Sequence, residues 1–208
     1  MIVTVTYPAA MKRRTDEVSS LHEHAAENLV FIRDAMERAG SFTAVPGRGG
    51  VVMGLTGLAA AIIAPGQETP QAWLGTWLAA AVVAFAVGLV AVLLKSREAG
   101  VPFLSRPARQ FALSFSPAIF AGALLTAALA RAELHTLLPG VWLLLYGAAF
   151  VAGGTFSVRI VPLMGLLFLF LGAIALFGSP LLGDVCLGVG FGALHIVFGT
   201  IIARGYGG

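Results

Sequence analysis

Residues 72–94 read AWLGTWLAAAVVAFAVGLVAVLL, a run of 23 residues without a charged side chain. About 20 apolar residues, within a range of roughly 17–25, let a helix cross the hydrocarbon core of a bilayer. The run lacks the period-2 alternation of a barrel strand, and a helix satisfies its own backbone polar groups within the membrane. This stretch therefore predicts a transmembrane helix.

Five further apolar runs follow the same pattern, separated by short polar breaks. The six predicted spans lie near 49–64, 72–94, 110–130, 137–153, 160–178 and 185–203. The first of them is short. The composition agrees, since 58% of the residues are hydrophobic and 11% are charged, whereas soluble domains contain about 25% charged residues. The predicted fold class is all-α, a polytopic membrane protein whose residues 49–208 form a six-helix transmembrane bundle.

The basic residues fall on one side of the predicted bundle. If the N-terminus is cytoplasmic, 12 of the 13 Lys and Arg residues lie in cytoplasmic segments and Arg131 alone lies outside. This bias is the positive-inside rule. Trp73, Trp77 and Trp142 fall at the opposite interface, where amphipathic rings are enriched. We expect a multi-pass protein of the cell inner membrane with both termini in the cytoplasm. Its basic residues then face the membrane surface, and they give no evidence for binding nucleic acid.

Residues 1–48 differ in kind and predict a cytoplasmic segment. The first 50 residues hold six of the 13 basic and six of the ten acidic residues. Ser20 and Glu23 have the spacing of a capping box, which predicts a helix over about 20–39. No apolar signal-peptide core is visible, and either Met1 or Met11 could be the first residue translated.

One face of the predicted 20–39 helix is apolar. Its stripe follows the spacing of an amphipathic helix and consists of Ala25, Leu29, Ile32, Met36 and Ala39. A flexible linker with Pro46 and several glycines follows. Two interpretations stay open: the helix covers the cytoplasmic side of the bundle, or it binds a protein partner or a second copy of the chain.

His195 is the one strongly ionisable side chain within the six predicted spans. It lies 11 residues after Asp184 and nine before Arg204, which places it near the middle of the membrane. Helical spacing puts it on one face with Gly188, Gly192 and Gly199, and Gly188 and Gly192 have the GxxxG spacing of closely packed helices. We expect His195 to point into a helix contact, either as a structural hydrogen-bonding group or as a functional one.

Ser114 and Ser116 flank Phe115 in the third span, just ahead of Pro117. Proline removes a backbone hydrogen bond from a helix, so a kink with two hydroxyl groups beside it could line a small polar pocket. The alternative is structural, because hydroxyl groups also satisfy the freed backbone carbonyl. With His195, these serines form the candidate intramembrane polar site.

No catalytic motif, cofactor site or metal site is predicted. Cys186 is the single cysteine, and His22 and His24 are two residues apart, so they point to different faces of a helix. An intramembrane serine protease of the rhomboid type needs a nucleophilic serine on its fourth span, and residues 137–154 contain none. These observations disfavour an enzyme. The leading hypothesis is a sensor or accessory membrane component that works through the 20–39 helix; the alternative is a small-solute or ion-coupled transporter with His195 in its pathway.

The stretches GSFTAVPGRGG (40–50), LPGVWLLLYG (138–147) and GALHIVFG (192–199) resemble sequences of uncharacterised bacterial six-span membrane proteins. The resemblance covers roughly residues 38–204, and its motifs are structural. It implies a six-span integral membrane fold. It assigns no activity and gives no residue a catalytic role.

Overall fold

The structure is a computed structural model of the chain, and it describes residues 28–29, 32, 46–98, 100 and 105–205. The chain from residue 41 onward forms one compact unit, to which the following description is confined. Within the predicted 20–39 helix, Asn28, Leu29 and Ile32 are described and are helical. The remainder of that helix lies outside the described residues.

Six helical stretches of the described chain are long and apolar enough to cross a membrane. They are α2 (Gly47–Ile63) with the short turn η1 (Ala64–Gly66), α3 (Pro70–Glu98), α4 (Arg106–Arg131), the turn η2 (His135–Leu137) with α5 (Leu138–Gly154), α6 (Ile160–Phe177), and α7 (Pro180–Leu187) continued by η3 (Gly188–Leu194) and α8 (His195–Gly205). The predicted all-α fold and the number of spans are confirmed.

Proline sets where several of these helices begin. Pro70, Pro107, Pro139 and Pro180 lie in the first turn of α3, α4, α5 and α7, where the missing N–H is not needed and the fixed φ suits a helix. Ser179 caps α7, accepting a hydrogen bond from the Leu182 N–H at 3.3 Å. The last span therefore begins five residues earlier than the predicted 185.

The first span is also longer than its prediction. It was expected over 49–64, whereas the helical stretch runs from Gly47 to Gly66, or 20 residues. The added residues are glycine and arginine at the start and a Pro65-containing turn at the end. Glycine and proline are only weakly apolar and Arg48 is charged, so hydropathy alone did not include them. The first span is thus long enough to cross the hydrocarbon core.

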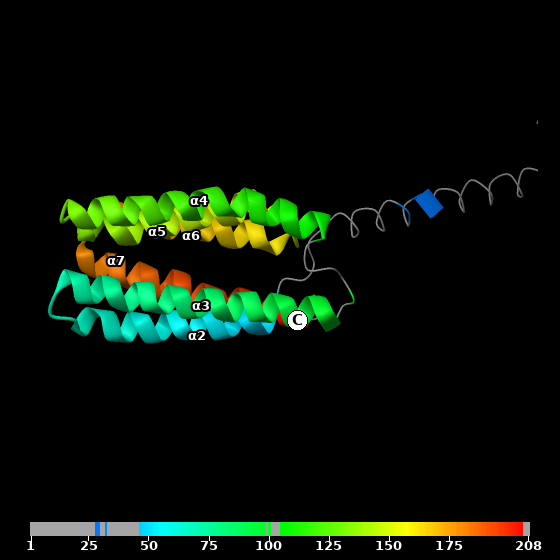
Figure 1. Ribbon diagram of the computed structural model, residues 1–208, viewed down its shortest axis with the longest axis horizontal. Coiled ribbons are helices and arrows are strands. Elements are labelled where there is room, and N and C mark those ends of the chain that lie inside the picture. The colour runs from blue at the N-terminus through cyan, green and yellow to red at the C-terminus, as the bar shows by residue number, and fades with distance from the viewer. Residues whose placement is uncertain (1–27, 30–31, 33–45, 99, 101–104, 206–208) are drawn as a thin grey trace, which may run out of the picture. The chain divides into compact units, whose positions relative to one another are not determined.

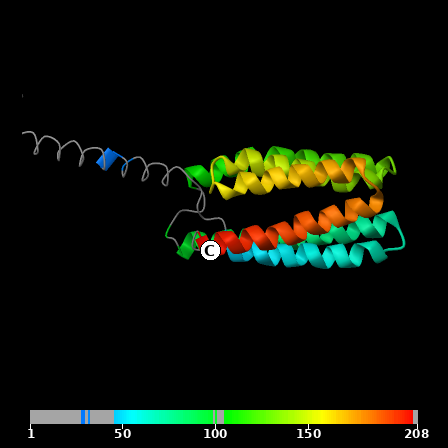
Figure 2. The ribbon, with the colours of Figure 1, turned by 180° about the vertical axis from the view of Figure 1, so that it is seen from behind.

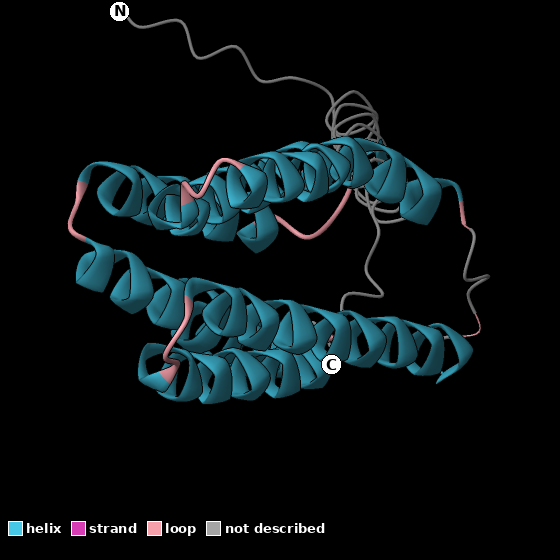
Figure 3. Cartoon of the chain, turned by 60° about the vertical axis from the view of Figure 1, so that its left-hand side comes forward, coloured by secondary structure: helices cyan, strands magenta, loops and turns pink. Residues whose placement is uncertain are grey.

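The six stretches pack as two layers of three helices (Figure 1). One layer contains α3, α2 and the α7–η3–α8 helix, with α2 in the middle; the other contains α4, α5 and α6, with α5 in the middle. The view from behind and the rotated view show the same two layers (Figures 2 and 3). The first layer thus combines the first two spans with the last one, so the layers differ from the two halves of the sequence.

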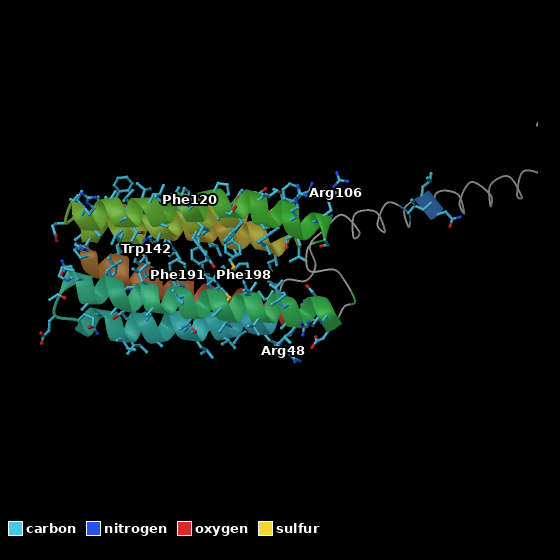
Figure 4. The ribbon with its side chains drawn as sticks, viewed as in Figure 1. Arg48, Arg106, Phe120, Trp142, Phe191 and Phe198 are labelled. Carbon is cyan, nitrogen blue, oxygen red and sulfur yellow. The ribbon has the colours of Figure 1, made fainter. Side chains whose placement is uncertain are left out.

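The two ends of the bundle carry different side chains. Arg48 and Arg106 lie at the end where α2 and α4 begin, which we call the basic end (Figure 4). Trp142 lies toward the other end, which we call the tryptophan end; α3, α5 and α7 begin there. Phe191 and Phe198 lie between the layers, whereas Phe120 points outward from α4 (Figure 4).

Glycine allows the backbones to approach closely within each layer. A Cβ atom added at Gly54 of α2 would lie 2.7 Å from the Gly192 carbonyl oxygen, and one added at Gly199 would lie 2.7 Å from the Gly47 carbonyl oxygen. In the other layer, a Cβ at Gly165 of α6 would lie 2.8 Å from the Gly147 carbonyl oxygen of α5. Real Cβ atoms do not approach oxygen this closely, so these contacts require glycine.

Candidate functional site

His195 lies between the two layers, and both of its ring nitrogens are hydrogen-bonded. Nε2 is 2.9 Å from the Tyr146 hydroxyl of α5, and Nδ1 is 3.2 Å from the Gly190 carbonyl oxygen of η3. The histidine side chain is buried, with 5% of its surface exposed. A polar group in this position needs such partners, because an unpaired one costs several kcal/mol in an apolar medium.

These partners assign the tautomer of His195. A carbonyl oxygen only accepts hydrogen bonds, so Nδ1 carries the hydrogen and donates it to Gly190. In a neutral imidazole the other nitrogen is then an acceptor, and the Tyr146 hydroxyl donates to Nε2. The pair forms a closed hydrogen-bonded bridge from η3 to α5. We call Gly190, His195 and Tyr146 the histidine bridge.

Aromatic rings surround the histidine bridge. The ring centroids of Tyr146 and Phe168 lie 5.6 Å from the centroid of His195, and those of Phe191 and Phe150 lie 6.2 and 6.4 Å from it. These rings come from α5, α6 and η3, and Phe115 of α4 adds an edge contact to Tyr146 at 5.9 Å. The bridge is thus the polar centre of an aromatic core that joins both layers.

A π-helical turn determines where His195 points. Residues 188–194 form this wider turn, which holds more residues than the 3.6 of an α-helix. In a regular α-helix, Gly190 and His195 would lie about 140° apart at 100° per residue. The wider turn instead places the His195 ring over the Gly190 carbonyl. π-Helical turns are rare and occur frequently at functional sites.

The three glycines predicted to share a helix face with His195 contact a different helix from those that the His195 side chain contacts. Gly188, Gly192 and Gly199 contact α2: a Cβ at Gly188 would lie 3.0 Å from the Ala61 Cβ, one at Gly192 would meet Leu58, and one at Gly199 would meet Val51. His195 points instead to α5 and α6. The prediction assumed α-helical spacing throughout, and the π-helical turn turns His195 away from the glycines.

Ser114 and Ser116 lie on α4, apart from the partners of His195. Ser116 is exposed and Ser114 is half-buried. The residue between them, Phe115, is the one whose ring reaches Tyr146 and Phe150. The predicted polar site of one histidine and two serines is thus not brought together as one cluster. Sequence reasoning missed Tyr146, whose position seven residues after Pro139 gave no polar pattern.

A second group of contacts lies at the tryptophan end, with one hydrogen bond within each layer and a pair of stacked rings between the layers. The Trp73 Nε1–H donates to Oδ1 of Asp184 at 2.9 Å, which links α3 to α7. The Trp142 Nε1–H donates to the Thr126 hydroxyl at 2.8 Å, which links α5 to α4. The indole rings of Trp73 and Trp142 are stacked, with centroids 5.7 Å apart. Sequence reasoning placed these tryptophans at one interface but did not connect them with Asp184.

Trp77 lies one turn further along α3 and is more deeply buried than its prediction as an interfacial residue implied. Its exposed fraction is 5%, and its ring lies 6.4 Å from Trp73 and 6.3 Å from Phe191. Its Nε1–H has no hydrogen-bond partner among the described residues. Together, Trp73, Trp77, Trp142 and Asp184 form what we call the tryptophan cluster.

Within the described part of the chain, no group of three or more His, Cys, Asp and Glu side chains is placed to hold a metal ion. Comparison of the sequence and structure with protein-family models, curated proteins and solved structures gives no match. The resemblance to bacterial six-span proteins therefore stays a prediction, and function must be inferred from the residues themselves.

Proposed function

We propose that this chain is a six-span protein of a bacterial inner membrane with both termini in the cytoplasm. In this proposal it acts without catalysis, as a sensor or accessory component whose N-terminal segment contacts a protein partner. The observation that carries the orientation is the charge at the two ends of the bundle. Seven of the eight described Lys and Arg residues belong to the basic end, and Arg131 alone belongs to the tryptophan end. Basic residues are retained on the cytoplasmic side of a membrane.

The acidic residues show the opposite distribution, and they contribute little to orientation, which Lys and Arg determine. Three of the four described acidic side chains, Glu68, Glu133 and Asp184, lie toward the tryptophan end, and Glu98 lies at the basic end. Trp73 and Trp142, whose rings are stacked, lie near the first residues of α3 and α5 at the tryptophan end, as expected of aromatic residues at a membrane interface. The basic end is therefore proposed to face the cytoplasm.

Cysteine labelling tests this orientation, because Cys186 is the single cysteine and is buried. Gln67→Cys and Glu98→Cys, each in a Cys186→Ser background, place one exposed thiol at opposite ends of α3. A membrane-impermeant maleimide should label Gln67→Cys in intact cells and label Glu98→Cys only after the cells are permeabilised. The reverse pattern would invert the proposed topology, and labelling of both in intact cells would contradict a six-span chain.

The partner-binding role rests on the apolar stripe predicted for residues 20–39. Leu29 and Ile32 of this stripe are helical and exposed, with 68% and 51% of their surfaces accessible. We propose that this stripe is the contact surface for the partner. The transport alternative has less support, because both nitrogens of His195 are already engaged by protein groups.

Affinity purification from membranes tests the partner. The intact chain should recover one protein at constant stoichiometry, and Leu29→Ser with Ile32→Ser should reduce its recovery by about a hundredfold or more, since two buried apolar side chains contribute roughly 1.5–3 kcal/mol each. Arg33 and Glu37 are predicted by helical spacing to lie off the apolar stripe, so exchanging them is the matched control and should leave recovery unchanged. Recovery of the chain alone, or of the same partner with both variants, would contradict this role.

A further inference from the structure

The tryptophan cluster contains all three tryptophans of the chain. Trp73 and Trp77 come from α3, Trp142 from α5, and the Asp184 carboxylate from α7, so both layers contribute to it. Trp73, Trp142 and Asp184 are half-buried, and Trp77 is buried beneath them. Trp73, Trp142 and Asp184 therefore keep partial exposure at the tryptophan end, whereas the Nε1 atom of Trp77 has none.

Two polar groups of the tryptophan cluster are left with hydrogen-bonding capacity. Asp184 accepts the Trp73 N–H at Oδ1, and among the described residues no basic side chain pairs with this carboxylate. The Trp77 Nε1–H is fully buried without a partner. A buried donor without an acceptor is costly, and native structures contain few of them. A ligand that accepts a hydrogen bond at Trp77 and carries positive charge near Asp184 would satisfy both groups.

We propose that the tryptophan cluster binds a small organic cation that carries a hydroxyl group, of the quaternary ammonium alcohol class. Indole faces attract quaternary ammonium groups, and tryptophan is the most effective aromatic residue for this. The Asp184 carboxylate adds the negative charge, while Oδ1 keeps its bond to Trp73. The ligand hydroxyl accepts from Trp77, which lies four residues further along α3, or about 6 Å at 1.5 Å per residue.

The arrangement selects against other ligand classes. An anion would face the Asp184 carboxylate, and Arg131 is the one described basic residue that belongs to this end. A hard metal ion such as Ca²⁺ takes six to eight oxygen ligands, whereas the cluster offers a single carboxylate. A quaternary ammonium group needs few direct ligands, because aromatic faces and one carboxylate suffice.

Intrinsic fluorescence reports this site directly, because every tryptophan of the chain belongs to it. Choline should change the emission of the purified full-length protein saturably. Tetramethylammonium lacks the hydroxyl and should bind about threefold to tenfold more weakly, as expected for one lost hydrogen bond. The neutral isostere 3,3-dimethylbutan-1-ol lacks the charge and should bind more weakly than choline by at least about tenfold. Equal responses to all three compounds would overturn the proposal.

Two variants distinguish the contribution of the Asp184 charge to binding from that of the Trp77 hydrogen bond. Asp184→Asn should weaken choline and tetramethylammonium binding alike, by about tenfold. Trp77→Phe keeps an aromatic ring but removes the N–H, so it should weaken choline binding to the level of tetramethylammonium and leave tetramethylammonium unchanged. Glu133→Gln, a charge change at the same end, is the matched control and should alter neither. Thermal unfolding of each variant in detergent verifies that the bundle is intact.

An unchanged choline affinity in Trp77→Phe would overturn the role of Trp77 and indicate that a buried water satisfies its N–H. The absence of any saturable response would overturn the site as a whole. The inference deepens the proposed sensor role, because the organic cation is the signal that the proposed sensor would detect. In this respect the inference rests on the proposed function. Choline binding by the purified protein depends neither on its orientation in the membrane nor on a protein partner. A negative binding result would therefore not change the conclusions drawn from cysteine labelling and affinity purification.

Discussion

Gly54→Leu is expected to prevent stable packing of the first helix against the last. A Cβ atom at Gly54 would lie 2.6 Å from Ile196 Cγ1 and 2.7 Å from the Gly192 carbonyl oxygen. The second of these neighbours is backbone, so α2 and the last span must separate to make room. We expect a loss of more than about 3 kcal/mol of unfolding free energy, at or beyond the upper end of the cost of overpacking a well-packed interior.

Gly75→Leu is the matched control for this prediction. Gly75 lies on α3, and a Cβ atom there meets nothing within 4 Å. Both substitutions remove a glycine from a helix and add the same side chain, so the difference between them reports the contact with the last span. The unfolding of each purified variant is measured by titration with a denaturing detergent. Equal stability of the two variants would contradict close backbone packing at Gly54.

The spans were predictable because a lipid bilayer, unlike water, does not satisfy the hydrogen-bonding groups of an exposed backbone. Runs such as 72–94 have no alternative to a helix in a bilayer, and the six predicted runs correspond to six helical stretches long and apolar enough to cross one. The residues at which the helices begin and end were harder to predict from hydropathy and charge. Asp184, for example, looked like the polar residue ahead of the last span, whereas Ser179 and Pro180 begin α7 before it.

Contacts between distant helices could not be predicted from the sequence. Hydropathy indicates that a helix is in the membrane but not which neighbour it packs against, so the pairing of α2 with the last span was not foreseen. Which helix His195 contacts could not be predicted for a related reason. A constant 3.6-residue period places it with Gly192 and Gly199, and seven residues of π-helix change that period.

His195→Ala is expected to destabilise the contact between the two layers. The substitution removes the hydrogen bonds to Tyr146 and Gly190 and leaves a space among Phe150, Phe168 and Phe191. Hydrogen bonds between membrane helices contribute about 0.6–2 kcal/mol each, and the cavity adds a further term. A loss of about 3 kcal/mol in unfolding free energy is expected, measured by the same detergent titration as for Gly54→Leu.

Tyr146→Phe separates the hydrogen bond from the cavity. It keeps the ring in place and leaves His195 Nε2 buried without its donor, at a cost of about 1–3 kcal/mol. Because the two residues share one hydrogen bond, combining His195→Ala with Tyr146→Phe should cost less than the sum of the single changes. Additive losses would contradict the Tyr146–His195 bond. A structural role further requires that Tyr146→Phe lower stability, whereas a residue that only lines a transport pathway would leave stability unchanged and alter flux in reconstituted vesicles.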